Sequence, residues 1–286
     1  MAETAERIDA HQHFWRLERG DYGWLTPEFG PIYRDFGPDD LAPLLKQHGI
    51  AGTVLVQAAP TDAETDYLLG IADGNDMVRG VVGWVDFEAE DAVERLRDLA
   101  RHPKFVGVRP MIQDIPAEDW MLNPAFAPVF EAIAELGLVF DALVLPRHLT
   151  HLDTLIKRHP QMTVVIDHGA KPEIATGRLD VWATDMVRLA AHENCHCKLS
   201  GFVTEAGEDW NVEQLAPYVA HILSVFGPER VIWGSDWPVM TLAAAYEDWV
   251  TATDVLIAGL HAAERAAVLG GNARRVYKLE NGGRHD

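Results

Sequence analysis

The 286-residue chain has little cysteine and no long apolar run. Cys195 and Cys197 are its only cysteines, and two positions is too short a spacing for an unstrained disulfide. We therefore expect two reduced, buried thiols on one face of a strand. A zinc site there would need further ligands, and only His196 lies nearby in the sequence. No window approaches about 18 apolar residues and no signal-like segment opens the chain, so we expect a cytoplasmic protein without a membrane span.

Positive charge is also scarce, since 24 Lys and Arg residues face 44 Asp and Glu residues and give a formal net charge of −20. Such a surface repels nucleic acid and anionic membranes, so we expect neither as a partner. A small-molecule substrate is the partner that this charge favours. Most carboxylates are expected simply to solvate helix faces. The sequence is compatible with a homo-oligomer.

No repeat, low-complexity tract or Pro/Ser-rich linker divides the chain, so we expect one domain over residues 1–286. Eight runs are typical of strands: Arg7–Phe14, Thr53–Gln57, Val78–Asp86, Phe105–Arg109, Leu138–Val144, Met162–His168, Cys195–Phe202 and Val231–Asp236. Amphipathic helical stretches alternate with them: Pro38–His48, Asp62–Gly74, Ala89–His102, Pro124–Leu136, His148–His159, Asp180–Glu193 and Glu213–Phe226. This alternation predicts parallel strands in an α/β fold, a closed (β/α)8 TIM barrel, with an open doubly wound sheet as the alternative.

An aromatic-rich loop, residues 15–36, follows the first strand and contains Trp15, Tyr22, Trp24, Phe29 and Tyr33. Loops of this length in a barrel commonly belong to the site. We expect this loop to cover the barrel mouth, and packing against the outer surface is the alternative.

Histidines and a carboxylate stand where the predicted strands end. His11 and His13 share one side of the first strand, and alternate strand residues lie close enough for both imidazoles to bind one ion. His168 ends the sixth strand and Asp236 ends the eighth. Because the carboxyl ends of barrel strands meet at one face, these four residues predict a metal or hydrolytic site there.

Other residues are predicted to contact substrate. Arg109 ends the fourth strand, where its guanidinium could hold a carboxylate or stabilise an oxyanion, with a loop salt bridge as the alternative. Lys198 would reach substrate if the polar face of its strand points inward, as would Ser200. The flat rings of Trp24, Trp84 and Trp237 suit the apolar side of a sugar, although tryptophans in such positions are more often packing residues.

A series of motifs in order spans nearly the whole chain and resembles one family. The motifs are Asp9-Ala10-His11-Gln12-His13-Phe14-Trp15, Val56-Gln57-Ala58, Gly80-Val81-Val82-Gly83-Trp84-Val85-Asp86, Val106-Gly107-Val108-Arg109, Ile166-Asp167-His168-Gly169-Ala170-Lys171-Pro172, Lys198-Leu199-Ser200-Gly201, Gly234-Ser235-Asp236-Trp237-Pro238 and Gly271-Asn272-Ala273-Arg274-Arg275-Val276-Tyr277. The chain is similar to the amidohydrolase superfamily, in the branch of sugar-acid lactonases that includes L-fuconolactonase, L-rhamnonolactonase and 2-pyrone-4,6-dicarboxylate lactonase.

This resemblance implies a (β/α)8 barrel with lactonase activity and a site made of His11, His13, His168, Asp236 and Arg109. The chain departs from the binuclear members of the superfamily, because Arg109 replaces a bridging lysine or glutamate and Asp141 replaces a histidine. We therefore expect one divalent ion, with Zn²⁺ the first choice and His11, His13, His168 and Asp236 as its ligands. The same branch also contains metal-free members, so metal-free catalysis is the alternative.

The mechanism that we expect is attack of water on a lactone carbonyl, with Asp236 as general base and with Arg109 and His168 polarising the carbonyl. Arg109 is the one cation placed by a motif, with Arg147, Lys171 and Lys198 as further candidates, so a neutral aldonolactone is favoured over a carboxylated lactone. The rival hypotheses are a metal-dependent decarboxylase of the same superfamily and a non-catalytic barrel that binds a ligand.

Overall fold

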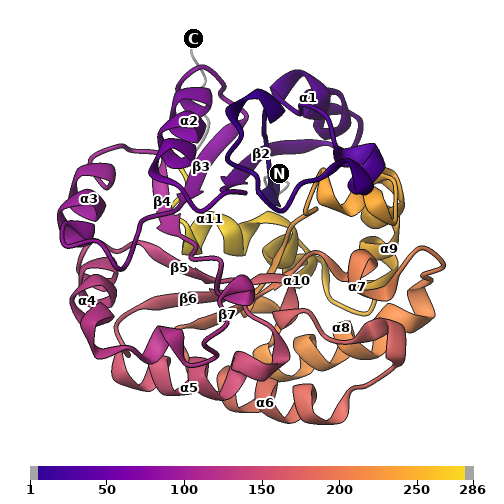
Figure 1. The fold of residues 1–286 in the computed structure, drawn as a ribbon. Coiled ribbons are helices and arrows are strands. Elements are labelled where there is room, and N and C mark those ends of the chain that lie inside the picture. The colour runs from indigo at the N-terminus through magenta and orange to yellow at the C-terminus, as the bar shows by residue number, and fades with distance from the viewer. Residues whose placement is uncertain (1–5, 281–286) are drawn as a thin grey trace.

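The computed structural model of the protein describes residues 6–280 as a ring of parallel strands surrounded by helices (Figure 1). Eight strands are hydrogen-bonded in sequence order. They are β1 (Arg7–Gln12), β2 (Ile50–Val56), β3 (Val78–Gly83), β4 (Phe105–Val108), β5 (Val139–Ala142), β6 (Thr163–Ile166), β7 (Cys195–Leu199) and β8 (Val231–Trp233). All seven neighbouring pairs are parallel. The predicted barrel topology is confirmed.

The barrel closes where the chain that follows β8 meets the end of β1. The Asp236 N–H donates to the His11 carbonyl at 2.8 Å, and the His13 N–H donates to the Trp237 carbonyl at 2.7 Å. Gln12 and Trp237 form a parallel bridge. These bonds lie at the carboxyl ends of both strands and bring His11, His13 and Asp236 into one small region.

Helices connect the strands because a parallel pair needs a crossover. They are α1 (Pro38–Gln47), α2 (Asp62–Asp73), α3 (Ala92–Leu99), α4 (Ala127–Glu135), α5 (Leu149–Arg158), α6 (Asp180–Ala190), α7 (Phe202–Ala206), α8 (Val212–Phe226), α9 (Tyr246–Leu256), α10 (Ala262–Ala266) and α11 (Asn272–Val276). The seven expected helices correspond to α1–α6 and α8. The strands are shorter than expected at their carboxyl ends, because the chain turns before it reaches His168 and Asp236.

Two apolar layers are buried. Inside the barrel, Val54, Val139 and Ile232 contact residues of the C-terminal segment, including Tyr277. The larger layer fills the space between strands and helices. The C-terminal segment reaches the amino ends of the strands, since Gly270 lies against the backbone of Glu6 and Ile8. In Figure 1, α11 crosses the centre of the ring.

Cys195 and Cys197 are both free and buried in the layer between strands and helices, as predicted. Burial raises the pKa of the Cys195 thiol to about 12, so it is uncharged at neutral pH. Within residues 6–280, no helix is both long enough and apolar enough to cross a membrane.

Candidate active site

Three imidazoles surround one carboxylate oxygen at the carboxyl ends of β1, β6 and β8. The Oδ1 atom of Asp236 lies 3.3 Å from Nε2 of His13, 3.7 Å from Nε2 of His11 and 3.8 Å from Nε2 of His168. All four side chains are buried. The structure thus brings together the four residues that the sequence analysis grouped from three separate strands.

Hydrogen bonds behind the rings fix the orientation of two imidazoles. The Nδ1 of His13 lies 2.8 Å from the Val56 carbonyl oxygen, which can only accept, so this nitrogen carries the proton. The Nδ1 of His168 is hydrogen-bonded to Oγ of Ser200 at 2.9 Å. Each ring therefore presents Nε2 to Asp236, and second partners of this kind set the tautomer of metal-binding histidines. Ser200, which was expected to touch substrate, positions His168.

Two site residues stand on backbone in the left-handed region. His168 has φ 53° and Asp236 has φ 63°, and residues other than glycine rarely adopt such angles. Glycines make room beside them. A Cβ atom at Gly201 would lie 2.6 Å from the His168 ring, and one at Gly234 would lie 2.7 Å from Cβ of His11. These turns cost conformational energy and aim both side chains into the barrel mouth.

His11 and His168 are uncharged at neutral pH. Burial lowers the pKa of His168 to about 4, although the Asp236 and Asp167 carboxylates act in the opposite sense. Burial likewise holds the pKa of His11 well below its usual range. Burial alone would raise the pKa of Asp236, but His168 and the other imidazoles outweigh it and hold that pKa below its usual value. His11 and His168 thus offer neutral nitrogen lone pairs beside an ionised carboxylate.

Arg109 adds a positive charge beside the histidines. Its Nη1 lies 3.3 Å from Nε2 of His11 and 3.3 Å from Oδ2 of Asp167, and its Nη2 donates to the Gln57 carbonyl. The Nε of Arg109 is buried and has no hydrogen-bond partner among the residues that the structure describes. This guanidinium lines the cavity of the site. It does not form a salt bridge with a surface loop, which was the alternative that the sequence left open.

Lys198 lies below the cavity, not in its wall. Its Nζ is fully buried and lies 2.6 Å from Oδ2 of Asp141 and 2.8 Å from Oδ1 of Asp167. The Tyr277 hydroxyl donates to Asp141 at 2.8 Å from the other side. Lys198 points inward, as the strand pattern predicted, but its ammonium is held by two carboxylates and does not reach the described cavities. Ion pairing outweighs burial and raises its pKa.

Asp167 is a site residue that the sequence analysis did not single out. It contacts Arg109 and Lys198, and its Oδ1 lies 3.5 Å from Nδ1 of His11. The available signal was its position beside His168 at the end of an apolar strand. Adjacent residues of a strand normally point to opposite faces, but the turn that begins at Asp167 lets both side chains reach the site.

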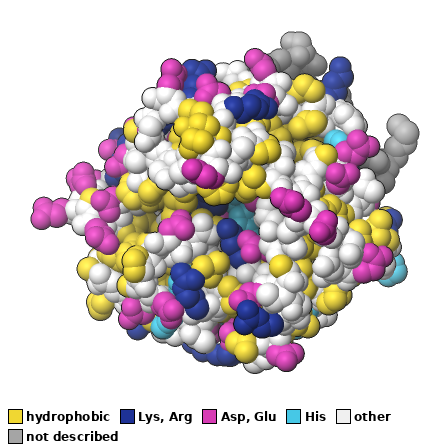
Figure 2. All heavy atoms as spheres, turned by 45° about the vertical axis from the view of Figure 1, so that its right-hand side comes forward, with side chains coloured by type: hydrophobic (Ala, Val, Ile, Leu, Met, Phe, Trp, Pro, Cys, Tyr) yellow, Lys and Arg dark blue, Asp and Glu magenta, His cyan; other side chains and the backbone are white. Residues whose placement is uncertain are grey.

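The site opens into a cavity of about 290 Å³ at the barrel mouth. Its floor includes His13, Arg109, His168 and Asp236, and Lys171 adds a second cation. Figure 2 shows the mouth as a hollow in which histidine is visible between basic and acidic side chains. The cavity is large enough for a single sugar ring.

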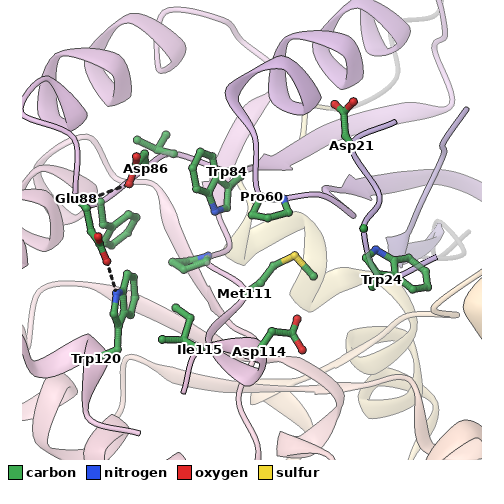
Figure 3. A pocket seen from close by; sticks show the side chains of 14 residues that line it. Asp21, Trp24, Pro60, Trp84, Asp86, Glu88, Met111, Asp114, Ile115 and Trp120 are labelled. Atoms are coloured by element: carbon green, nitrogen blue, oxygen red, sulfur yellow. Dashed lines mark hydrogen bonds between the residues drawn. The ribbon is translucent and has the colours of Figure 1, made fainter. Parts of the chain in front are cut away.

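The loop of residues 15–36 contributes to this mouth. Trp15 and Phe36 bridge across its base, and Trp24 and Phe29 line the cavity. Trp84 lines a second cavity next to it (Figure 3). Trp237 lines neither cavity, because its ring is buried edge-on against Phe36 with 5.2 Å between the ring centres. The structure therefore gives Trp237 a packing role, in contrast to the predicted substrate contact.

The donor set fits a divalent metal ion. The ligand atoms of His11, His13 and Asp236 all lie within 4.8 Å of one another, and those of His11, Asp167 and His168 form a second, overlapping group. Buried neutral imidazoles with an ionised carboxylate are the ligands of catalytic zinc sites. His11 belongs to both groups.

A (β/α)8 barrel with this cluster of histidines and carboxylates fits a hydrolase, and the comparison with known families agrees. The sequence profile of the amidohydrolase family matches residues 8–279. The chain belongs to the amidohydrolase family.

Particular relatives narrow the comparison further. An L-fucono-1,5-lactonase of Burkholderia ambifaria is 46% identical over 280 residues, which is 96% of each chain. An L-fucono-1,5-lactonase of Burkholderia multivorans is 37% identical over 96% of this chain and 97% of its own. A crystal structure of an amidohydrolase from Burkholderia multivorans with bound zinc is 36% identical and superimposes with a TM-score of 0.90, over 96% of this chain and 100% of that one.

Proposed function

We propose that the protein hydrolyses a sugar-acid lactone to the open hydroxy acid. The observation that carries this proposal is the convergence of three imidazoles on the Asp236 carboxylate, beside Arg109, at the floor of a cavity of sugar size. Ester hydrolysis needs a base for water and a positive group for the developing oxyanion, and both are present. The names of the two lactonase relatives support a lactone as the ester.

In the proposed reaction, Asp236 accepts a proton from water as the water oxygen bonds to the lactone carbonyl carbon. Arg109 would stabilise the negative charge that the carbonyl oxygen gains, and His168 would add a second donor when its Nε2 carries a proton instead of binding a metal ion. The bond between that carbon and the ring oxygen then breaks. The leaving ring oxygen takes the proton back from Asp236, so the product is a hydroxy acid whose carboxylate lies near Arg109 and Lys171.

A divalent ion, Zn²⁺ as first choice, would be held by His11, His13, Asp236 and His168. Bound there, it would supply Lewis acidity and lower the pKa of water to about 7. This matters because Asp236, whose pKa is held below its usual value, is a weak base for ordinary water. In catalysis without an ion, Arg109 and His168 would have to stabilise the oxyanion by themselves.

The substrate that we propose is a neutral aldonolactone such as L-fucono- or L-rhamnonolactone. Arg109 and Lys171 are the two Lys or Arg side chains that line the catalytic cavity, and the carbonyl end of the substrate would occupy both. Lys198, which could have served a second carboxylate, is neutralised below the floor. The geometry therefore favours an uncharged lactone over a dicarboxylate.

The test is hydrolysis of a lactone panel by the purified protein, followed with a pH indicator, before and after chelator treatment, with bound metal measured on the same sample. We expect acid release from a deoxy-hexonolactone, loss of activity on chelation and recovery with Zn²⁺. Carbon dioxide release from an aromatic acid, without acid release from any lactone, would instead support a decarboxylase.

A further inference from the structure

A second cavity adjoins the catalytic one and has no role in the reaction described above. Its volume is about 480 Å³, and it lies between the loops that follow β1, β3 and β4 (Figure 3). Trp24, Met111 and Asp114 line both cavities, so the two spaces share one boundary. The second cavity can therefore receive a part of a substrate that extends past this boundary.

The walls of the second cavity are largely aromatic. Trp24 donates its indole N–H to the Ala58 carbonyl at 2.7 Å, and Trp120 donates to the Glu88 carboxylate at 3.2 Å. The indole N–H of Trp84 has no acceptor among residues 6–280, and Figure 3 shows its nitrogen directed into the cavity. Flat ring faces pack on the C–H side of a sugar, and a free indole N–H can donate to a hydroxyl oxygen.

The second cavity is more acidic than the catalytic cavity, in which Arg109 and Lys171 balance Asp114 and Asp236. Asp21, Asp86, Glu88 and Asp114 line it, and none of the lining residues is a lysine or arginine. Asp21 is neutralised by Arg19 at 2.6 Å. Asp114 is exposed, and its hydrogen bond comes from the amide of Gln113 at 3.3 Å, so its carboxylate is uncompensated at the shared boundary.

We propose that the second cavity is a specificity subsite that receives the uncharged, hydroxylated end of the lactone and excludes a carboxylate, with Asp114 as the deciding residue. This inference rests on the proposed lactonase function. A substrate hydroxyl can donate to the Asp114 carboxylate, whereas a substrate carboxylate would meet a like charge in a partly enclosed space. The subsite thus discriminates between substrates by the charge of the end that lies away from Arg109.

Three lactones with one ring configuration test this proposal, because they differ only at carbon 6. L-Fucono-1,5-lactone has a methyl group there, L-galactono-1,5-lactone a hydroxymethyl group, and the galactaro-1,5-lactone of the same configuration a carboxylate. We expect the wild-type kcat/KM for the two neutral lactones to exceed that for the acid by about 100-fold, since an excluded charge commonly costs two factors of ten.

Asp114→Asn keeps the shape of the side chain and removes its charge. We expect it to raise the ratio of kcat/KM for the galactaro-lactone to kcat/KM for L-fucono-1,5-lactone by about tenfold. Asp119→Asn is the matched control, because Asp119 is an exposed acid of the same segment that lines neither cavity. It should leave the ratio of the two substrates unchanged.

Trp84→Phe tests the wall independently, because it keeps a flat ring and removes the N–H donor. We expect KM for L-galactono-1,5-lactone to rise about fivefold with kcat unchanged, as for the loss of one hydrogen bond made equally to substrate and transition state.

An unchanged substrate ratio in Asp114→Asn would overturn the assignment of Asp114. Wild-type protein that cleaves the galactaro-lactone as fast as the neutral lactones would overturn the subsite and leave the lactonase function intact. If the protein cleaves none of the three lactones or the wider panel, the proposed function fails and the subsite fails with it.

Discussion

The two ends of the barrel differ in backbone, polarity and packing. At the carboxyl ends of the strands lie four of the five non-glycine residues with positive φ in the described chain, His168, Ala170, Lys171 and Asp236 among buried polar groups. At the amino ends, the C-terminal segment closes the barrel with apolar side chains. At the carboxyl ends, strained backbone orients the reactive side chains at a cost in conformational energy. At the amino ends, burial of apolar side chains stabilises the fold. Activity and folding should therefore respond to different substitutions.

Asp236→Asn should show the largest difference between an effect on activity and an effect on stability. The amide keeps the shape of the side chain but can neither accept a proton from water nor serve as an anionic ligand, so we expect kcat/KM for the lactone to fall by about 10³–10⁴-fold. The free energy of unfolding, from urea denaturation, should change by no more than about 1 kcal/mol.

Asp209→Asn, at an exposed acid far from the site residues in the sequence, is the control and should behave like wild type. An Asp236→Asn variant that retains a tenth of wild-type activity would exclude Asp236 as the base.

Lys198→Met should affect both stability and activity, because Lys198 connects the site to the barrel interior. The substitution leaves the buried Asp141 carboxylate without a cation and Asp167 with Arg109 alone, and we expect the free energy of unfolding to fall by about 3–4 kcal/mol. Activity should fall as well, since Asp167 also contacts Arg109 and His11.

Lys157→Met removes the same charge from a lysine that pairs with Asp153 at 2.7 Å on the surface of α5. Exposed pairs contribute little, so the expected loss is below about 1 kcal/mol. Equal losses in the two variants would contradict a structural role for the buried pair.

The sequence could predict the barrel and the ends of its strands, because strand and helix periodicity fix which residues stand at the carboxyl edge. His11, His13, His168 and Asp236 are brought together on that basis. The pairing of Lys198 with Asp141 and Asp167 could not be predicted, since partners across a barrel depend on how far each side chain reaches over its interior. The packing of loops could not be predicted from the sequence either. The burial of Trp237 in the core and the position of Trp120 in the wall of a cavity are two examples.

Gly270→Ala should affect the closed end alone. A Cβ atom at this position would lie 2.1 Å from the Glu6 carbonyl oxygen and 3.0 Å from the Ile8 nitrogen, so the C-terminal segment must shift from the first strand. We expect a loss of about 2–3 kcal/mol in urea unfolding, with kcat/KM of the folded protein within about twofold of wild type.

Gly259→Ala is the matched control, because a Cβ there meets no atom within 4 Å. If Gly270→Ala lowers kcat/KM of the folded protein by much more than twofold, the two ends of the barrel are coupled. The conclusion that activity and folding respond to different substitutions would then be wrong.

The smallest expected effect is a change in the pH dependence of stability at His196, on the inward-facing side of β7. Burial lowers its pKa to about 4, with Arg275 and Arg230 acting in the same direction. The unfolded chain binds a proton below about pH 6.5, and the folded chain does so only near pH 4. His196 therefore destabilises the protein progressively as the pH falls from 6.5 to 4.

His196→Gln should remove about 1 kcal/mol of that loss, measured as the difference in unfolding free energy between pH 7 and pH 4.5. His151→Gln, on α5, is the control, and an identical pH dependence in the two variants would show that His196 is protonated equally well in both states.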